Sequence, residues 1–169
     1  MKKKIKIREK RDTDDNKIME ILNSFVEDSF AVYTEELVAS TFVINSTENA
    51  RVFLVIEIND EVIGFGMITP YKNYSNFSHT GVLGYFIEND FTGLGYGSIL
   101  LEELIVKGNK IGITNYLAHI SSHNKQSLSF HKKHGFEEVG RFKNVSIKFG
   151  KPVDIIWVQK NFNAMLAEG

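Results

Sequence analysis

Residues 91–98 read Phe-Thr-Gly-Leu-Gly-Tyr-Gly-Ser, with glycine at every second position of the central stretch. They separate an apolar run ending near Ile87 from a run of helical spacing that carries Leu100 and Leu104, which predicts a loop between a strand and a helix. Glycine allows successive backbone N–H groups to converge, and the positive end of the helix dipole adds to their effect. We expect this loop to bind a phosphate or pyrophosphate, although three close glycines could also serve only a tight turn.

The spacing of these glycines argues against two common nucleotide-binding loops. The Walker A loop requires Gly-Lys-Ser/Thr after its gap, and no lysine follows Gly97 directly. The dinucleotide fingerprint is GxGxxG, whereas this chain has GxGxG. A nucleotide-phosphate hydrolase would also need metal ligands and a phosphate-gripping lysine, and the sequence offers neither pattern. The loop therefore indicates another kind of phosphate-containing ligand.

Outward from the loop, the hydrophobic pattern predicts a mixed α/β fold. Strands are expected over residues 4–8, 51–58, 62–68, 79–87, 113–120, 145–148 and 153–159, and helices from Asp12–Asp15 onward, from near Thr34, from Gly93 to about Lys107 and over residues 126–134. Gly108 and Gly135 are expected to end the last two helices. Because several strands follow one another as hairpins, a pure doubly wound parallel sheet is disfavoured. We predict a mixed, mostly antiparallel sheet of six to seven strands flanked by about four helices.

The composition limits the classes of protein and partner. Twenty Lys and Arg against 21 Asp and Glu give a net charge of −1, so we expect neither nucleic acid nor a membrane surface as partner. The chain has no cysteine, which excludes disulfides, thiolate metal sites and cysteine nucleophiles. The start lacks the apolar region of a signal peptide, and no apolar run approaches the roughly 20 residues of a membrane span. We expect one cytoplasmic domain over residues 1–169, without a metal.

Further segments accompany the glycine loop. Residues 119–136 contain an Asn, a Ser and a Gly-Phe pair, and residues 148–159 contain an Asp and a Trp. Together with residues 88–104 they resemble the GCN5-related N-acetyltransferase (GNAT) superfamily, whose acetyl-CoA signature is Gln/Arg-x-x-Gly-x-Gly/Ala. Residues 148–159 and 70–80 are similar to the phosphinothricin acetyltransferase branch. The resemblance implies the GNAT fold and acetyl-CoA-dependent acetylation of the primary amine of a small molecule, an amino acid or an analogue such as phosphinothricin or methionine sulfoximine.

The resemblance also implies where acetyl-CoA binds. The expected contacts are Tyr85, Phe86, Ile87, Thr92, Gly93, Leu94, Gly95, Tyr96, Gly97, Ser98, Asn124 and Ser127. In the resembled fold, the strand before the loop splays from its neighbour, and its backbone N–H groups would hold the acetyl carbonyl and the pantetheine. Because the net charge is near zero, we expect backbone donors rather than a basic surface to hold the phosphates.

The spacing of three and four residues places Asn124, Ser127 and His131 on one helix face. His131 occupies the position where most family members have a tyrosine acid and the phosphinothricin branch has histidine. It could protonate the CoA thiolate or orient a water that does. Simpler interpretations stay open: Asn124 as a helix N-cap, Ser127 as a first-turn hydroxyl, and His131 as a solvated helix residue.

The chain departs from the family pattern where the amine would lose its proton. Val82 stands where the phosphinothricin branch has a Glu, two residues after the matching Thr, and Thr92 replaces the usual Gln or Arg. Pro152 stands where the branch usually has Trp. Strand alternation puts His79 on the same face as Tyr85, so His79 is a candidate base acting through water, although it could simply be a polar residue at a strand start.

The acceptor pocket is the least determined part of the site. Phe30, Tyr33, Tyr71, Tyr74 and Phe77 could wall a pocket for a small amine, or pack in the core and loops. Without cysteine, direct attack of the amine on the thioester is the expected route.

Two alternatives stay open: a non-catalytic CoA-binding sensor domain that has lost its base, and acetylation of a protein or peptide amine. The resemblance also suggests a homodimer.

Overall fold

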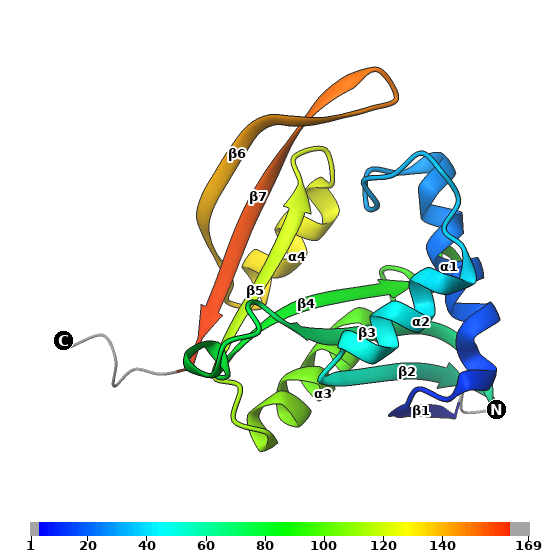
Figure 1. The fold of residues 1–169 in the computed structure, drawn as a ribbon. Coiled ribbons are helices and arrows are strands. Elements are labelled where there is room, and N and C mark those ends of the chain that lie inside the picture. The colour runs from blue at the N-terminus through cyan, green and yellow to red at the C-terminus, as the bar shows by residue number, and fades with distance from the viewer. Residues whose placement is uncertain (1–3, 163–169) are drawn as a thin grey trace.

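In the computed structural model, which describes residues 4–162, seven strands form one sheet in the order β1-β2-β3-β4-β5-β7-β6 (Figure 1). The strands are β1 (Ile5–Glu9), β2 (Val52–Ile58), β3 (Glu61–Pro70), β4 (Thr80–Ile87), β5 (Asn115–Ser121), β6 (Glu137–Lys148) and β7 (Lys151–Asn161). The helices are α1 (Asp15–Asp28), α2 (Ser40–Asn49), α3 (Tyr96–Lys110) and α4 (Lys125–Lys133). Neighbouring strands are antiparallel except β4 and β5, which are parallel. The mixed, mostly antiparallel sheet predicted from the sequence is confirmed.

Each face of the sheet carries its own hydrophobic cluster, because side chains alternate along the strands. On β2, Leu54 and Ile56 pack with the core-facing leucines of α3. The intervening Phe53 and Val55 pack with α1 and α2 on the other face. Figure 1 shows α1 and α2 on one side of the sheet and α3 on the other. Both faces of β2 are therefore buried, which explains its nearly continuous apolar run.

The sheet divides between β4 and β5. These strands pair only through Thr80–Val82 on β4 and Asn115–Leu117 on β5. Beyond that point they diverge, as Figure 1 shows, and within residues 4–162 the edge of β4 that faces β5 has no strand partner from Leu83 to Ile87. The gap lies next to the glycine loop, so the fold leaves unpaired backbone polar groups where a ligand was expected.

The second helix begins at Ser40, so the prediction of a helix from near Thr34 is wrong. The Thr34 side chain accepts a hydrogen bond from the backbone N–H of Glu36, at 2.9 Å. The side chain of Asn23 bonds both backbone groups of Val38, at 2.9 and 3.2 Å. These local bonds offer the backbone an alternative to helical pairing. Residues 34–39 consequently form an irregular segment beside the gap between β4 and β5.

Gly108 lies inside α3 and does not end it, contrary to expectation. A Cβ at Gly108 would lie 2.4 Å from the hydroxyl of Tyr116 on β5, so close packing requires the glycine. The helix continues to Lys110, and Gly112 follows with φ +86°. The closing hairpin is also longer than predicted, because two irregularities in the β6–β7 register break the alternation that sequence patterns detect.

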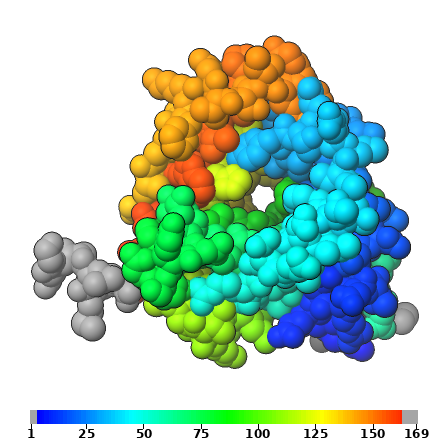
Figure 2. All heavy atoms as spheres, in the orientation of Figure 1, coloured from blue at the N-terminus to red at the C-terminus, as the bar shows by residue number. Residues whose placement is uncertain are grey.

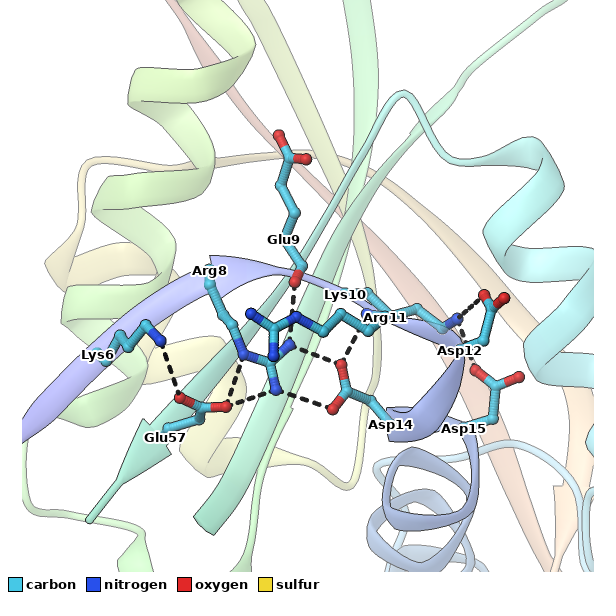
Figure 3. A network of polar contacts seen from close by, with 9 residues as sticks. All are labelled: Lys6, Arg8, Glu9, Lys10, Arg11, Asp12, Asp14, Asp15 and Glu57. Carbon is cyan, nitrogen blue, oxygen red and sulfur yellow. Dashed lines mark hydrogen bonds and ion pairs between the residues drawn. The ribbon is translucent and has the colours of Figure 1, made fainter. Parts of the chain in front are cut away.

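A charged cluster joins β1, β2 and the start of α1 (Figure 3). Arg8 on β1 donates to Glu57 on β2 at 2.6 Å and to both carboxylate oxygens of Asp14 at 2.7 and 2.9 Å. Asp14 also accepts the backbone N–H of Arg11 at 2.7 Å. The Arg8 and Asp14 side chains are only 13% and 7% exposed. The Arg8 guanidinium therefore links the edge strand β1 to the N-terminus of α1.

Replacing Asp14 by asparagine is expected to lower the free energy of unfolding by about 3 kcal/mol at pH 7, because Arg8 would lose a buried partner. Hydrogen bonding to Arg8 lowers the pKa of Asp14, so this contribution is present above the unfolded pKa of roughly 4 and is lost as the pH falls through the lower folded value. Urea unfolding of the wild type and of Asp14→Asn at several pH values between 7 and 3 measures this difference in the free energy of unfolding. Asp12→Asn is the matched control, since Asp12 is fully exposed; equal losses in both variants would contradict the prediction.

Candidate active site

A cavity of about 1020 Å³ lies where β4 and β5 diverge. It is lined by the segment after α1, the second half of β4, the glycine loop, the end of β5 and helix α4. Figure 2 shows an opening through the molecule, bordered by the light-blue and cyan segments and by yellow-green residues. The predicted site residues that line the cavity are Phe30, Tyr33, Tyr85, Phe86, Ile87, Thr92, Gly93, Gly95, Gly97, Ser98, Asn124, Ser127 and His131. The fold therefore brings most of the predicted site together.

The glycine loop leaves open space at the start of α3. Gly93 and Gly95 have φ values of +74° and +89°, and a Cβ built on either would meet no atom within 4 Å. Gly95 is the N-cap of α3, so the unpaired N–H groups of the first helical turn adjoin this space. A phosphate group fits both the space and the positive end of the helix dipole. Gly97 differs, because a Cβ there would lie 3.6 Å from the Phe130 ring of α4.

The side chains of two predicted contacts point elsewhere. Leu94 is 59% exposed and does not line the cavity. Tyr96 is buried in the core, where its ring lies 6.2 Å from that of Phe91. Thr92 does line the cavity, and its hydroxyl donates to the carbonyl of Asn89 at 2.8 Å. Leu94 and Tyr96 could therefore contact a ligand in the cavity only through their backbone.

Helix α4 adds positive charge that the sequence analysis overlooked. Lys125 and Lys133, its first and last residues, both line the cavity. Two basic side chains therefore lie at the cavity of a chain of near-zero net charge, a feature that the expectation of backbone donors alone did not include. The Asn124 side chain accepts the N–H of Ser127 at 3.1 Å, so Asn124 is the N-cap of α4 while it also lines the cavity.

His131 is buried, with 3% exposure, and forms a pair with Tyr85. Its Nδ1 lies 2.7 Å from the carbonyl oxygen of Ser127, which can only accept, so the ring proton sits on Nδ1. Its Nε2 therefore accepts from the Tyr85 hydroxyl, 2.6 Å away. Burial lowers the pKa of His131 and raises that of Tyr85. Both groups are neutral at pH 7, and the interpretation of His131 as a solvated residue is wrong.

A second tyrosine–histidine pair lines the same cavity. The Tyr33 hydroxyl lies 2.9 Å from Nδ1 of His119 on β5, and the two rings are stacked. His119 also contacts Trp157 on β7, with ring centroids 5.0 Å apart. His119 is not among the site residues predicted from the sequence. Its position between the apolar residues Ala118 and Ile120 is the signal that could have shown it on the opposite face of the strand.

The closing hairpin holds the segment that carries Tyr33. The buried Lys148 donates to the backbone carbonyl of Val32 at 2.5 Å, and the Glu35 carboxylate accepts the backbone N–H of Phe149 at 2.6 Å. Phe30 packs against Phe149, with ring centroids 5.4 Å apart. These contacts link residues distant in sequence and position Tyr33 opposite His119.

Besides Leu94 and Tyr96, the predicted residues His79, Tyr71, Tyr74 and Phe77 lie outside the cavity lining. His79 precedes β4, and its backbone carbonyl accepts hydrogen bonds from the backbone N–H groups of Thr114 and Asn115, at the start of β5. It lies six residues from Tyr85, which is roughly 20 Å along a strand. Tyr71 and Phe77 contact each other in the loop between β3 and β4, and Tyr71 also contacts Trp157. Tyr71 therefore reaches the cavity wall only through Trp157 and His119.

Two further features concern residues 4–162. Within that range, His, Asp and Glu side chains form no cluster of three that could hold a metal ion. None of the helices in the same range is long and apolar enough to cross a membrane.

The profile of the acetyltransferase (GNAT) family matches residues 17–136, from the first turn of α1 to the residue before β6. The chain belongs to this family. It is similar to an L-methionine sulfoximine/L-methionine sulfone acetyltransferase of Pseudomonas paraeruginosa, at 26% identity over 151 residues, 86% of this chain and 88% of the relative. A phosphinothricin N-acetyltransferase of Alcaligenes faecalis is 31% identical over 113 residues, 66% of this chain and 57% of the relative.

A solved structure agrees with this assignment. YncA from Salmonella typhimurium, solved with acetyl-CoA, is similar with a TM-score of 0.86 at 25% identity, covering 95% of each chain. The resemblance identified in the sequence is confirmed, and the protein is a GNAT N-acetyltransferase.

Proposed function

We propose that this GNAT enzyme transfers an acetyl group from acetyl-CoA to the primary amine of a small molecule, an amino acid or an analogue of one. The observation that carries the proposal is one cavity that joins the glycine loop at the start of α3, the unpaired edge of β4 and two tyrosine–histidine pairs. The relatives named above supply the substrate class, because they are acetyltransferases of methionine sulfoximine and phosphinothricin.

The cavity residues suit acetyl-CoA in three places. The space at Gly93 and Gly95 would take the pyrophosphate against the first turn of α3. Lys125 and Lys133 would add charge for the remaining phosphate. The unpaired edge of β4 between Leu83 and Ile87 would bond the amide groups of the pantetheine arm and the acetyl carbonyl.

Acetyl-CoA supplies the thioester carbon that the amine attacks and the sulfur that leaves. The Tyr85–His131 pair can move the proton that this exchange requires. Tyr85 Oη accepts the N–H proton of the attacking amine while its own proton passes to His131 Nε2. His131 Nε2 then gives that proton back to Tyr85 Oη, and Tyr85 donates its other proton to the leaving sulfur. Nδ1 of His131 stays bonded to the Ser127 carbonyl throughout and holds the ring in place. The thiol has a pKa near 8.5, so its protonation at pH 7 is favourable.

A thiol-release assay tests the proposal. Purified protein with acetyl-CoA is offered methionine sulfoximine, phosphinothricin, the common amino acids, simple alkylamines, and peptides with a free N-terminus or a lysine. Release of CoA with a free amino acid or analogue, confirmed by mass spectrometry of the N-acetyl product, is expected. Binding of acetyl-CoA without turnover of any amine would favour a sensor domain, and turnover of peptides alone would favour protein acetylation.

A further inference from the structure

The two tyrosine–histidine pairs lie on opposite faces of the sheet. Tyr85 packs against the cluster that contains α3, and His131 lies beside it on α4. His119 alternates with Ala118 and Ile120, which belong to that cluster, so its side chain projects to the face of α1 and α2. Tyr33 approaches from that face, since the preceding Val32 packs against the cluster of α1 and α2.

His119 also stands at the point where the strands part. Val82 and Leu117 form the last pair between β4 and β5, and His119 lies two residues beyond. Val82 and His119 project to the same face, because Leu83 faces the cluster of α3. Val82 has no acid–base group on this face of β4. The imidazole of His119, on the neighbouring strand β5, supplies one close to that position.

The rest of this side of the cavity has little chemistry of its own. Its walls include the apolar side chains of Leu22, Phe25, Val38, Phe42 and Phe86. The hydroxyls of Ser29 and Thr34 donate to the carbonyls of Phe25 and Glu36, and that of Ser121 accepts the N–H of His123 at 3.3 Å. The ring of His123, which also lines the cavity, has its Nε2 2.9 Å from the carbonyl oxygen of Pro152. His119 instead bonds the Tyr33 hydroxyl, a side-chain group that can pass on a proton.

We propose that Tyr33 and His119 bind the acceptor ammonium and remove its proton before the attack on the thioester. The ammonium N–H bond breaks as its proton passes to Tyr33 Oη, and the Tyr33 proton moves to His119 Nδ1. The nitrogen keeps the electron pair, and His119 becomes an imidazolium, which releases its proton to solvent before the next turnover because His119 is exposed. This role rests on the proposed acetyl transfer and assigns its first proton transfer to residues distinct from Tyr85 and His131.

The electrostatics of the pair agree with this role. Desolvation by the surrounding protein lowers the pKa of His119, although the residue remains exposed to solvent, and raises that of Tyr33 to about 12. A neutral hydroxyl therefore faces a neutral imidazole at pH 7. The neighbours of His119 are Tyr33 from the segment after α1 and Trp157 from β7. Tyr33 is the titratable one, and no charged side chain contributes to the lowered pKa. General-base catalysis typically contributes about 10²–10⁴-fold to a rate.

The test compares His119→Gln and Tyr33→Phe with the wild type, using an amine accepted in the thiol-release assay. We expect kcat/KM to fall roughly 100-fold or more in both variants at pH 7. In the wild type, kcat/KM for the amine should be flat from pH 7 to 9. In both variants it should rise about tenfold per pH unit, because only amine that is already neutral can react below its pKa near 10.

Two measurements separate this role from structural damage. Calorimetry should give acetyl-CoA affinities within about twofold of the wild type, since neither residue adjoins the glycine loop. In NMR titrations of the protein with CoA, the ring signals of His119 should shift when the amine is added, and Tyr33→Phe should weaken that response. His134→Gln, a histidine outside the cavity whose ring bonds the carbonyl of Phe130, is the control and should keep the wild-type rate and pH profile.

The outcomes are distinguishable from failure of the proposed function. If no amine is acetylated by the wild type, acetyl transfer itself is refuted. If the wild type is active and either His119→Gln or Tyr33→Phe keeps its rate and flat profile, the proton relay is overturned while the activity stands. His79→Gln decides between the two histidines, because a larger loss there than in His119→Gln would also overturn the proposal.

Discussion

Gly95→Val is expected to weaken CoA binding by on the order of 100-fold, equivalent to about 3 kcal/mol. The position has φ +89°, a conformation that a β-branched residue adopts only with strain. The added side chain would also project into the open space at the N-terminus of α3, where the phosphates are expected. Isothermal titration calorimetry with CoA measures the effect directly.

Gly112→Val provides the matched control for that variant. Gly112 follows the other end of α3, with φ +86° and nothing within 4 Å of a built Cβ. Its backbone strain is therefore comparable, but it does not line the cavity. We expect similar losses of stability in urea for both variants and reduced CoA affinity only for Gly95→Val. Unchanged affinity in Gly95→Val would refute the assignment of the phosphate site.

His131→Gln is expected to lower kcat by roughly 10²–10³-fold and to change acetyl-CoA affinity by less than about threefold. Removal of the imidazole deprives the Tyr85 hydroxyl of its acceptor, 2.6 Å away, and breaks the proton path. Steady-state kinetics and calorimetry separate the two quantities. Tyr85→Phe should produce a similar loss of kcat, because it interrupts the same path.

The pH dependence gives the His131 prediction a second readout. The proposed relay requires neutral His131, and burial lowers its pKa below the ordinary 6.5. The wild-type kcat should therefore remain on its plateau as the pH falls to 6.5 and decline only at lower pH. Equal losses of kcat and of acetyl-CoA affinity in His131→Gln would instead indicate a binding role.

Local patterns account for the parts of the fold that were predicted correctly. The alternation in β1, the hairpin of β2 and β3, and the glycine loop before α3 each depend on residues close in sequence. The errors occur where distant residues decide. Local pattern predicts a helix stop at Gly108, because the contact of Gly108 with Tyr116 cannot be recognised from the sequence. The helix expected near Thr34 is absent because Asn23, on α1, bonds the backbone of Val38.

The candidate site shows the same division. The glycine spacing and the segments around residues 88–104 and 119–136 were sufficient to predict the family, and residues of both segments line the cavity. Spacing also placed Asn124, Ser127 and His131 on one helix face, and all three line the cavity. The partner of His131 could not be predicted, because Tyr85 lies 46 residues away on another element.

By itself, the sequence determined the strand and helix patterns, the position of the glycine loop and the absence of cysteine chemistry, because each depends on residue type and local spacing. Only the tertiary structure decided which groups meet at the acceptor end. His79 lies on a plausible strand face but outside the cavity, whereas His119 meets Tyr33 because the closing hairpin holds the segment after α1. Which side chains contact each other depends on where the strands diverge and on how distant segments pack. Neither can be predicted from the local periodicity of the sequence.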